Sequence, residues 1–163
     1  MKTIRLPGNR VIALPTLYGA LAVCLGTGLI ATLLALGHFG VYRTLALPPL
    51  APPAPLFGVV WTVLYALMAV SLSIVYESRS PIRRAALAVT GLQLLFNAAW
   101  VFFFFRMRSY GLAFWELCIL LFLVLAMLEC FLRVDSFAAL LQVPYLLWTA
   151  FACYLNLGVL LLN

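Results

Sequence analysis

Charged residues divide this chain into long apolar blocks, at residues 11–36, 44–76, 85–105, 109–132 and 136–163. The acids Glu116 and Glu129 are the only charges inside them, both in the fourth block. A helix needs about 20 apolar residues to cross the roughly 30 Å hydrocarbon core of a bilayer. The chain is also 67% hydrophobic and 9% charged, whereas soluble domains are about 25% charged. The blocks therefore predict an integral membrane protein.

The fold class that follows is an all-α transmembrane bundle forming one domain over residues 1–163. We expect five helices, at about 11–36, 56–76, 84–105, 110–132 and 137–161. Strands are not expected, because a membrane barrel needs alternating segments of about 10 residues. The first block exceeds a signal-peptide core of about 7–15 residues, so we expect it to be retained as a helix.

The longest linker, at about 37–55, is rich in proline and therefore stiff and extended. Composition leaves two interpretations of it open. It is either a solvated spacer or a loop that caps one mouth of the bundle.

Lysine and arginine predict the orientation. Seven of them flank the N-terminal side, in the N-terminus and in the second and fourth linkers, and three flank the other side. The positive-inside rule then places the N-terminus in the cytoplasm and the C-terminus outside. The net charge of +6 indicates contact with anionic lipid, and no soluble basic face exists to bind nucleic acid.

Metal and cofactor chemistry are not expected. Cys24, Cys118, Cys130 and Cys153 have no paired spacing, and His38 is the single histidine. We therefore predict no metal site and no cofactor.

Two amides interrupt the apolar stretch "QLLFNAAWVFFFFR" at 93–106. Gln93, Asn97, Trp100 and Phe104 share one helical face. In hydrocarbon an unpaired polar group costs several kcal/mol, so this face should point into the bundle. It is either helix–helix packing held by hydrogen bonds or one wall of a binding cavity.

Similar rows occur on the other helices. They are Trp61, Tyr65, Met68 and Leu72 on the second; Leu112, Glu116 and Ile119 on the fourth; and Tyr145, Trp148, Ala152 and Leu155, with Asn156 beside them, on the fifth. Such rows are often packing alone. Three rows that combine tryptophan with tyrosine or an amide favour a cavity for a large, flat, mostly apolar ligand.

Glu116 is a carboxylate inside the membrane, which is a functional hypothesis by default. We expect a binding or structural hydrogen-bond role, with proton transfer as the alternative, and Arg106 and Arg108 lie within reach of it in sequence. Glu129 is expected to form an ion pair with Arg133, four residues on.

Three motifs in order resemble the TspO/MBR family of tryptophan-rich sensory proteins and translocator proteins, also called peripheral benzodiazepine receptors. They are "PPAPLFGVVWTVLYALM" at 52–68, "QLLFNAAWVFFFF" at 93–105 and "VPYLLWTAFACYLN" at 143–156. The resemblance covers about residues 40–158.

The resemblance implies a five-helix bundle, a homodimer, and a cavity under the first loop that binds porphyrins or other tetrapyrroles. The ligand-binding residues it implies, together with the polar positions above, are Trp61, Tyr65, Gln93, Asn97, Trp100, Glu116, Tyr145, Trp148, Ala152, Leu155 and Asn156. In some bacterial members two tryptophans, matching Trp61 and Trp148, are implicated in porphyrin degradation in light.

The chain also departs from the family pattern. Its first loop, "LPPLAPPAP", has no tryptophan, and Leu112 stands where a tryptophan is common. Glu116 occupies a position that is often aspartate. No basic residue follows Tyr154, so the cholesterol motif of animal members is not expected to function here.

The leading hypothesis is a membrane receptor or sensor for tetrapyrroles, without catalytic residues. The alternatives are an enzyme that degrades porphyrin with light and oxygen, a tetrapyrrole transporter, and a structural membrane protein whose aromatic rows only pack. Consumption of porphyrin, flux across sealed vesicles and the absence of stoichiometric binding would distinguish them.

Overall fold

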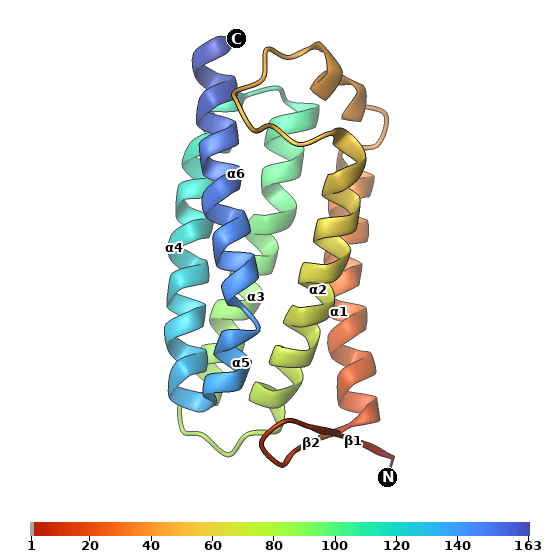
Figure 1. Cartoon of the computed structure of the whole chain (residues 1–163), viewed down its shortest axis with the longest axis vertical. Coiled ribbons are helices and arrows are strands. Elements are labelled where there is room, and N and C mark those ends of the chain that lie inside the picture. The colour runs from red at the N-terminus through yellow and green to blue at the C-terminus, as the bar shows by residue number, and fades with distance from the viewer. Residues whose placement is uncertain (1) are drawn as a thin grey trace.

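The computed structural model describes residues 2–163, and its five long apolar helical spans confirm the predicted fold class. The spans are Leu14–Leu34, Ala54–Glu77, Arg83–Arg106, Tyr110–Val134 and Ser136–Leu162. Figure 1 shows them side by side, with the two chain ends at opposite ends of the bundle. An odd number of crossings requires that arrangement.

The helices pack as two groups joined through the third span. Helix α1 (Leu14–Leu34) packs on α2 (Ala54–Glu77) and on α3 (Arg83–Val101). Helix α4 (Tyr110–Val134) packs on α3 and on α6 (Val143–Leu162), while the short α5 (Ser136–Leu140) reaches α2. Figure 1 shows α1 and α2 on one side and α4 and α6 on the other.

The expectation of no strands is wrong at the N-terminus, where β1 (Thr3–Leu6) and β2 (Arg10–Ala13) form an antiparallel hairpin. Its turn has Gly8 and Asn9 in the left-handed region, at φ 75° and 58°, which these two residue types tolerate best. Helix α1 consequently begins at Leu14 and not at residue 11, with Pro15 in its first turn. The hairpin lies across the N-terminal end of the bundle (Figure 1).

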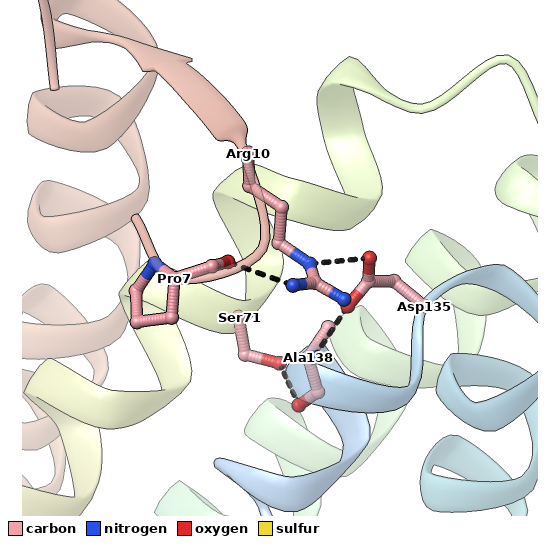
Figure 2. Close-up of polar contacts among 5 residues, drawn as sticks. All are labelled: Pro7, Arg10, Ser71, Asp135 and Ala138. Atoms are coloured by element: carbon pink, nitrogen blue, oxygen red, sulfur yellow. Dashed lines mark hydrogen bonds and ion pairs between the residues drawn. The ribbon is translucent and has the colours of Figure 1, made fainter. Parts of the chain in front are cut away.

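Hydrogen bonds fasten this hairpin to the bundle (Figure 2). Arg10 Nε donates to Asp135 Oδ2 at 2.6 Å, and the same guanidinium donates to the carbonyl of Pro7 at 2.7 Å. Nearby, the Ser71 hydroxyl donates to the carbonyl of Ala138, which ties α2 to α5. The Ala13 N–H donates to Glu77 Oε1 at 2.9 Å.

The fifth span is not one continuous helix. A turn at residues 141–142 separates α5 from α6, and Pro144 lies in the first turn of α6. Proline has no N–H to continue the ladder from the preceding helix, so the span restarts there.

The third span changes its winding where it passes the aromatic residues. After Val101 it continues as a π-helical turn, η2 (Phe102–Arg106), in which the Met107 N–H donates to the carbonyl of Phe102 at 3.0 Å. Phe104 and Phe105 then both lie beside Trp100, with ring centres 5.3 and 6.1 Å away. Such local π turns are frequent at functional sites.

The first loop lies over the C-terminal end of the bundle (Figure 1), where it includes the short helix η1 (Phe39–Thr44). Asn163 bonds the backbone N–H and carbonyl of Ala46, each at 3.0 Å, and the Tyr154 hydroxyl donates to Pro49 at 2.9 Å. Pro48 packs so tightly on Gly158 that a Cβ there would lie 2.5 Å from the proline ring. The loop therefore caps this end by direct contact with α6.

Candidate functional site

A chain of buried polar side chains crosses the middle of the bundle. The Tyr65 hydroxyl donates to Asn97 Oδ1 at 2.6 Å, and Asn97 Nδ2 donates to the Tyr145 oxygen at 3.1 Å. The Tyr145 hydroxyl donates in turn to Gln93 Oε1 at 2.7 Å, and Gln93 Nε2 lies 3.3 Å from Met68 Sδ. These contacts link α2, α3 and α6, so hydrogen bonds satisfy both amides.

A second polar contact orients the tryptophan of α3. Trp100 Nε1 donates to Asn156 Oδ1 at 3.1 Å, and Asn156 Nδ2 donates to the carbonyl of Tyr110 at 2.8 Å. The indole is thus held between α3, α6 and the start of α4. Because this hydrogen bond satisfies the indole N–H, the remaining apolar ring can line a cavity wall.

A cavity of about 460 Å³ lies against these groups. It lies between α1, α2 and α3 beneath the capping loop. Four predicted site residues line it: Trp61, Tyr65, Asn97 and Trp100. The volume is within the range of about 300–1,000 Å³ that is typical of ligand sites.

The sequence did not indicate the wall that α1 and the loop supply. Gly28 and Thr32, one helical turn apart, line the cavity from α1, and Phe39, Tyr42 and Phe57 line it near the loop. Gly28 packs against Tyr65, because a Cβ there would lie 2.7 Å from the tyrosine ring. A glycine and a threonine at i, i+4 in the first span were the available signal for this wall.

The predicted residues on α6 lie on the other side of an aromatic partition. Trp148 and Ala152 line a void of about 10 Å³, and Ala152, Leu155 and Asn156 line another of about 30 Å³. Phe57 borders the large cavity and both voids, with its ring centre 5.8 Å from that of Trp148. The predicted site is therefore one aromatic cluster with unequal space on its two sides.

Gln93, Tyr145 and Glu116 line neither the large cavity nor these two voids. Gln93 and Tyr145 are parts of the hydrogen-bonded chain behind the cavity wall. Glu116 is 6% exposed, and among residues 2–163 neither of its carboxylate oxygens has a hydrogen-bond partner.

One expectation for the fourth span is wrong. Leu112 and Ile119 do not share the inward face of Glu116, since they are 46% and 49% exposed. Arg106 and Arg108 are exposed and form no ion pair with Glu116 within the described chain. Arg108 has a left-handed backbone, at φ 53°, where the chain turns between the third and fourth spans. The expected pair of Glu129 and Arg133 is confirmed, at 2.8 Å.

The five spans, with an aromatic cavity under a capping loop, define a multi-pass integral membrane bundle. Residues 20–162 match the model of the TspO/MBR family, and the chain belongs to that family.

Curated relatives are similar over most of their length. The chain is 39% identical to the Tryptophan-rich protein TspO of Chlorobaculum tepidum over 125 residues, which cover 75% of this chain and 78% of that one. It is 34% identical to the Tryptophan-rich sensory protein of Cereibacter sphaeroides, covering 75% and 76%. It is 33% identical to the Translocator protein of Ovis aries, covering 72% of each.

Proposed function

We propose that this membrane protein is a receptor or sensor that binds a porphyrin or related tetrapyrrole in the cavity between α1, α2 and α3. The observation that supports this most is the cavity wall itself, where Trp61 and Trp100 stand beside the hydrogen-bonded pair Tyr65 and Asn97. Aromatic faces suit a flat ring system, and a few fixed polar atoms suit its polar edge.

The test is a titration of the purified protein with protoporphyrin in neutral detergent, followed by tryptophan fluorescence. Trp61→Phe should weaken binding about three- to tenfold and reduce quenching, because it removes part of an aromatic wall. Trp115→Phe is the matched control, since Trp115 is 68% exposed on α4 and lines none of the cavities above. It should change the starting fluorescence and leave the affinity intact.

A second pair of variants tests the cavity by filling it. Gly58 lines the cavity and has open space around its Cβ position, so Gly58→Leu should enter the cavity without a clash and weaken binding at least tenfold. Gly26→Leu on α1 also enters open space but outside this cavity, and it should bind like the parent protein. Unchanged affinity in both Gly58→Leu and Trp61→Phe would place the ligand elsewhere.

Two further measurements separate the alternatives. If the protein consumes more than one equivalent of porphyrin under illumination, it is a porphyrin-degrading enzyme and not a receptor. If the protein carries porphyrin into sealed vesicles, it is a transporter.

A further inference from the structure

The linker between α2 and α3 forms a concave basic surface at the hairpin end of the bundle. Arg79, Arg83 and Arg84 line a hollow of about 350 Å³ together with Ser78 and Ser80. Arg79 and Arg84 are exposed. Arg83 is held in place, because its Nη1 donates to the carbonyls of Tyr76 and Ser78 at 3.2 and 3.5 Å.

Within the described chain these three arginines have no carboxylate partner. The two ion pairs there are Arg10 with Asp135 and Arg133 with Glu129. Glu77 is the acid nearest in sequence, and its Oε1 accepts the backbone N–H of Ala13. No acidic residue or side-chain cap occupies the first turn of α3 in the described residues, so that helix end adds to the positive potential.

An apolar groove begins beside this basic surface. It has a volume of about 600 Å³, lies between α1, α2 and α3, and is lined mainly by small and aliphatic residues such as Gly19, Ala20, Leu87 and Gly91. Tyr76 also lines it, and the Arg83 guanidinium lies 6.0 Å from the centre of the Tyr76 ring. The groove and the basic surface therefore meet at Tyr76.

We propose that this end of the protein binds an anionic phospholipid, with its phosphate on Arg79, Arg83 and Arg84 and one acyl chain in the adjoining groove. Charge complementarity selects this occupant: guanidinium groups match phosphate oxygens in geometry and charge, and a groove in the transmembrane region suits a hydrocarbon chain. The basic surface lies in the linker between the second and third spans, where a bilayer crossed by those spans would place its headgroups, and the groove follows the spans inward. The site is separate from the tetrapyrrole cavity, so either proposal can fail alone.

The role of the arginine charges is tested by native mass spectrometry, which gives the dissociation constant of the first bound lipid. The two lipids compared are dioleoyl phosphatidylglycerol and dioleoyl phosphatidylcholine. Phosphatidylglycerol should bind more tightly. Arg79→Gln with Arg84→Gln should weaken it about 25-fold, at about fivefold for each charge near the surface. The control is Arg106→Gln with Arg108→Gln, the two arginines at the other end of the third span, which should change it less than twofold.

The groove is tested with two glycines of the same helix. Gly19 lines the groove and its Cβ position is open, so Gly19→Leu should fill the groove and weaken the binding of both lipids. Gly26→Leu also enters open space, outside the groove, and should have no effect. A parent-like melting temperature for each variant shows that loss of lipid is not loss of the fold.

Three results would overturn the proposal. The first is equal affinity for the two lipids in the parent protein, or unchanged phosphatidylglycerol binding in the Arg79 and Arg84 double variant. The second is displacement of the lipid by millimolar inorganic phosphate, which would make this a site for a free anion. The third is conversion of a dimer to a monomer by Gly19→Leu with lipid binding intact, which would assign the groove to a second copy of the chain.

Discussion

Replacing Asp135 should lower the free energy of unfolding. The loss can be divided between two contacts, the ion pair with the N-terminal hairpin and the cap of α5. Asp135 Oδ2 accepts from Arg10 Nε at 2.6 Å, while Oδ1 accepts the Ala138 N–H at 2.9 Å and caps α5 (Figure 2). Asparagine keeps an oxygen for the cap but removes the charge. Alanine removes both.

The side chains of Arg10 and Asp135 are 25% and 19% exposed, so water screens this pair less than a surface pair. We expect Asp135→Asn to cost about 1 kcal/mol, near the upper end for exposed pairs. Asp135→Ala should cost about 2 kcal/mol, because loss of an N-cap adds about 1 kcal/mol. Glu129→Gln is the control: its pair with Arg133 is 57% and 67% exposed and should contribute only about 0.3 kcal/mol.

The contribution of Asp135 should depend on pH with a definite sign. Burial raises the pKa of its carboxyl, but the hydrogen bonds from Arg10 and the Ala138 N–H and the charge of Arg10 together lower it below its ordinary value. A folded-state pKa below the unfolded value of about 3.9 means that the stabilisation is complete above that value. It is lost as the pH falls toward the folded pKa. The difference in unfolding free energy between the parent protein and Asp135→Asn should therefore be constant from about pH 6 to 8 and should shrink as the pH falls below the unfolded value of about 3.9.

The assay is unfolding in mixed neutral and anionic detergent, run as a double-mutant cycle with Arg10→Gln. A coupling free energy of about 1 kcal/mol between the two positions supports the reasoning. Additive single effects at neutral pH would refute it, since the pair would then contribute nothing to stability. So would a gap that widens as the pH falls.

The remaining predictions concern the site and the orientation. Trp148→Phe should weaken protoporphyrin binding less than Trp61→Phe, about two- to threefold, because Trp148 does not line the large cavity; equal effects in the fluorescence titration would contradict this. Ala152→Thr should weaken the same binding with the melting temperature kept, since it adds bulk beside voids of about 10 and 30 Å³; unchanged affinity would place Ala152 outside the ligand's reach. Glu116→Gln should keep stability and affinity and Glu116→Ala should lose one of them, as expected for a buried side chain with a packing or hydrogen-bond role; if neither changes, Glu116 does not belong to the site. Reporter fusions should place the N-terminus in the cytoplasm and the C-terminus outside; signals from the same side would contradict the five-span count, and the reverse orientation would contradict the positive-inside assignment.

The helical spans could be predicted from the sequence because the bilayer demands long uncharged segments, and those are visible in any single chain. The N-terminal hairpin could not. Its β2 strand occupies the first residues of an apolar block, and hydropathy alone does not distinguish three strand residues from the start of a helix. The left-handed turn at Gly8 and Asn9 and the ion pair from Arg10 to Asp135, 125 residues away, decide the outcome.

The inward face of the third span was also predictable, since Gln93, Asn97, Trp100 and Phe104 are all buried. Which of these residues line the cavity could not be predicted. Gln93 and Asn97 repeat the same side-chain chemistry one turn apart, yet Asn97 borders the cavity and Gln93 lies behind it. Both amides bond the Tyr145 hydroxyl, and Asn97 also accepts from Tyr65, which lines the cavity.

Phe57 lies between the large cavity and the residues of α6 that the motifs indicate. Its ring lies between Tyr42 of the capping loop and Trp148 of α6, with centres 5.4 and 5.8 Å away. Phe57 and Trp100 each border the large cavity and both small voids, so these two rings separate the three spaces. If the proposed ligand fills the large cavity, it contacts Trp61 and Trp100, which line that cavity, and not Trp148, which does not. We therefore expect substitutions that line this cavity on α1, α2 and α3 to change the affinity more than substitutions on α6.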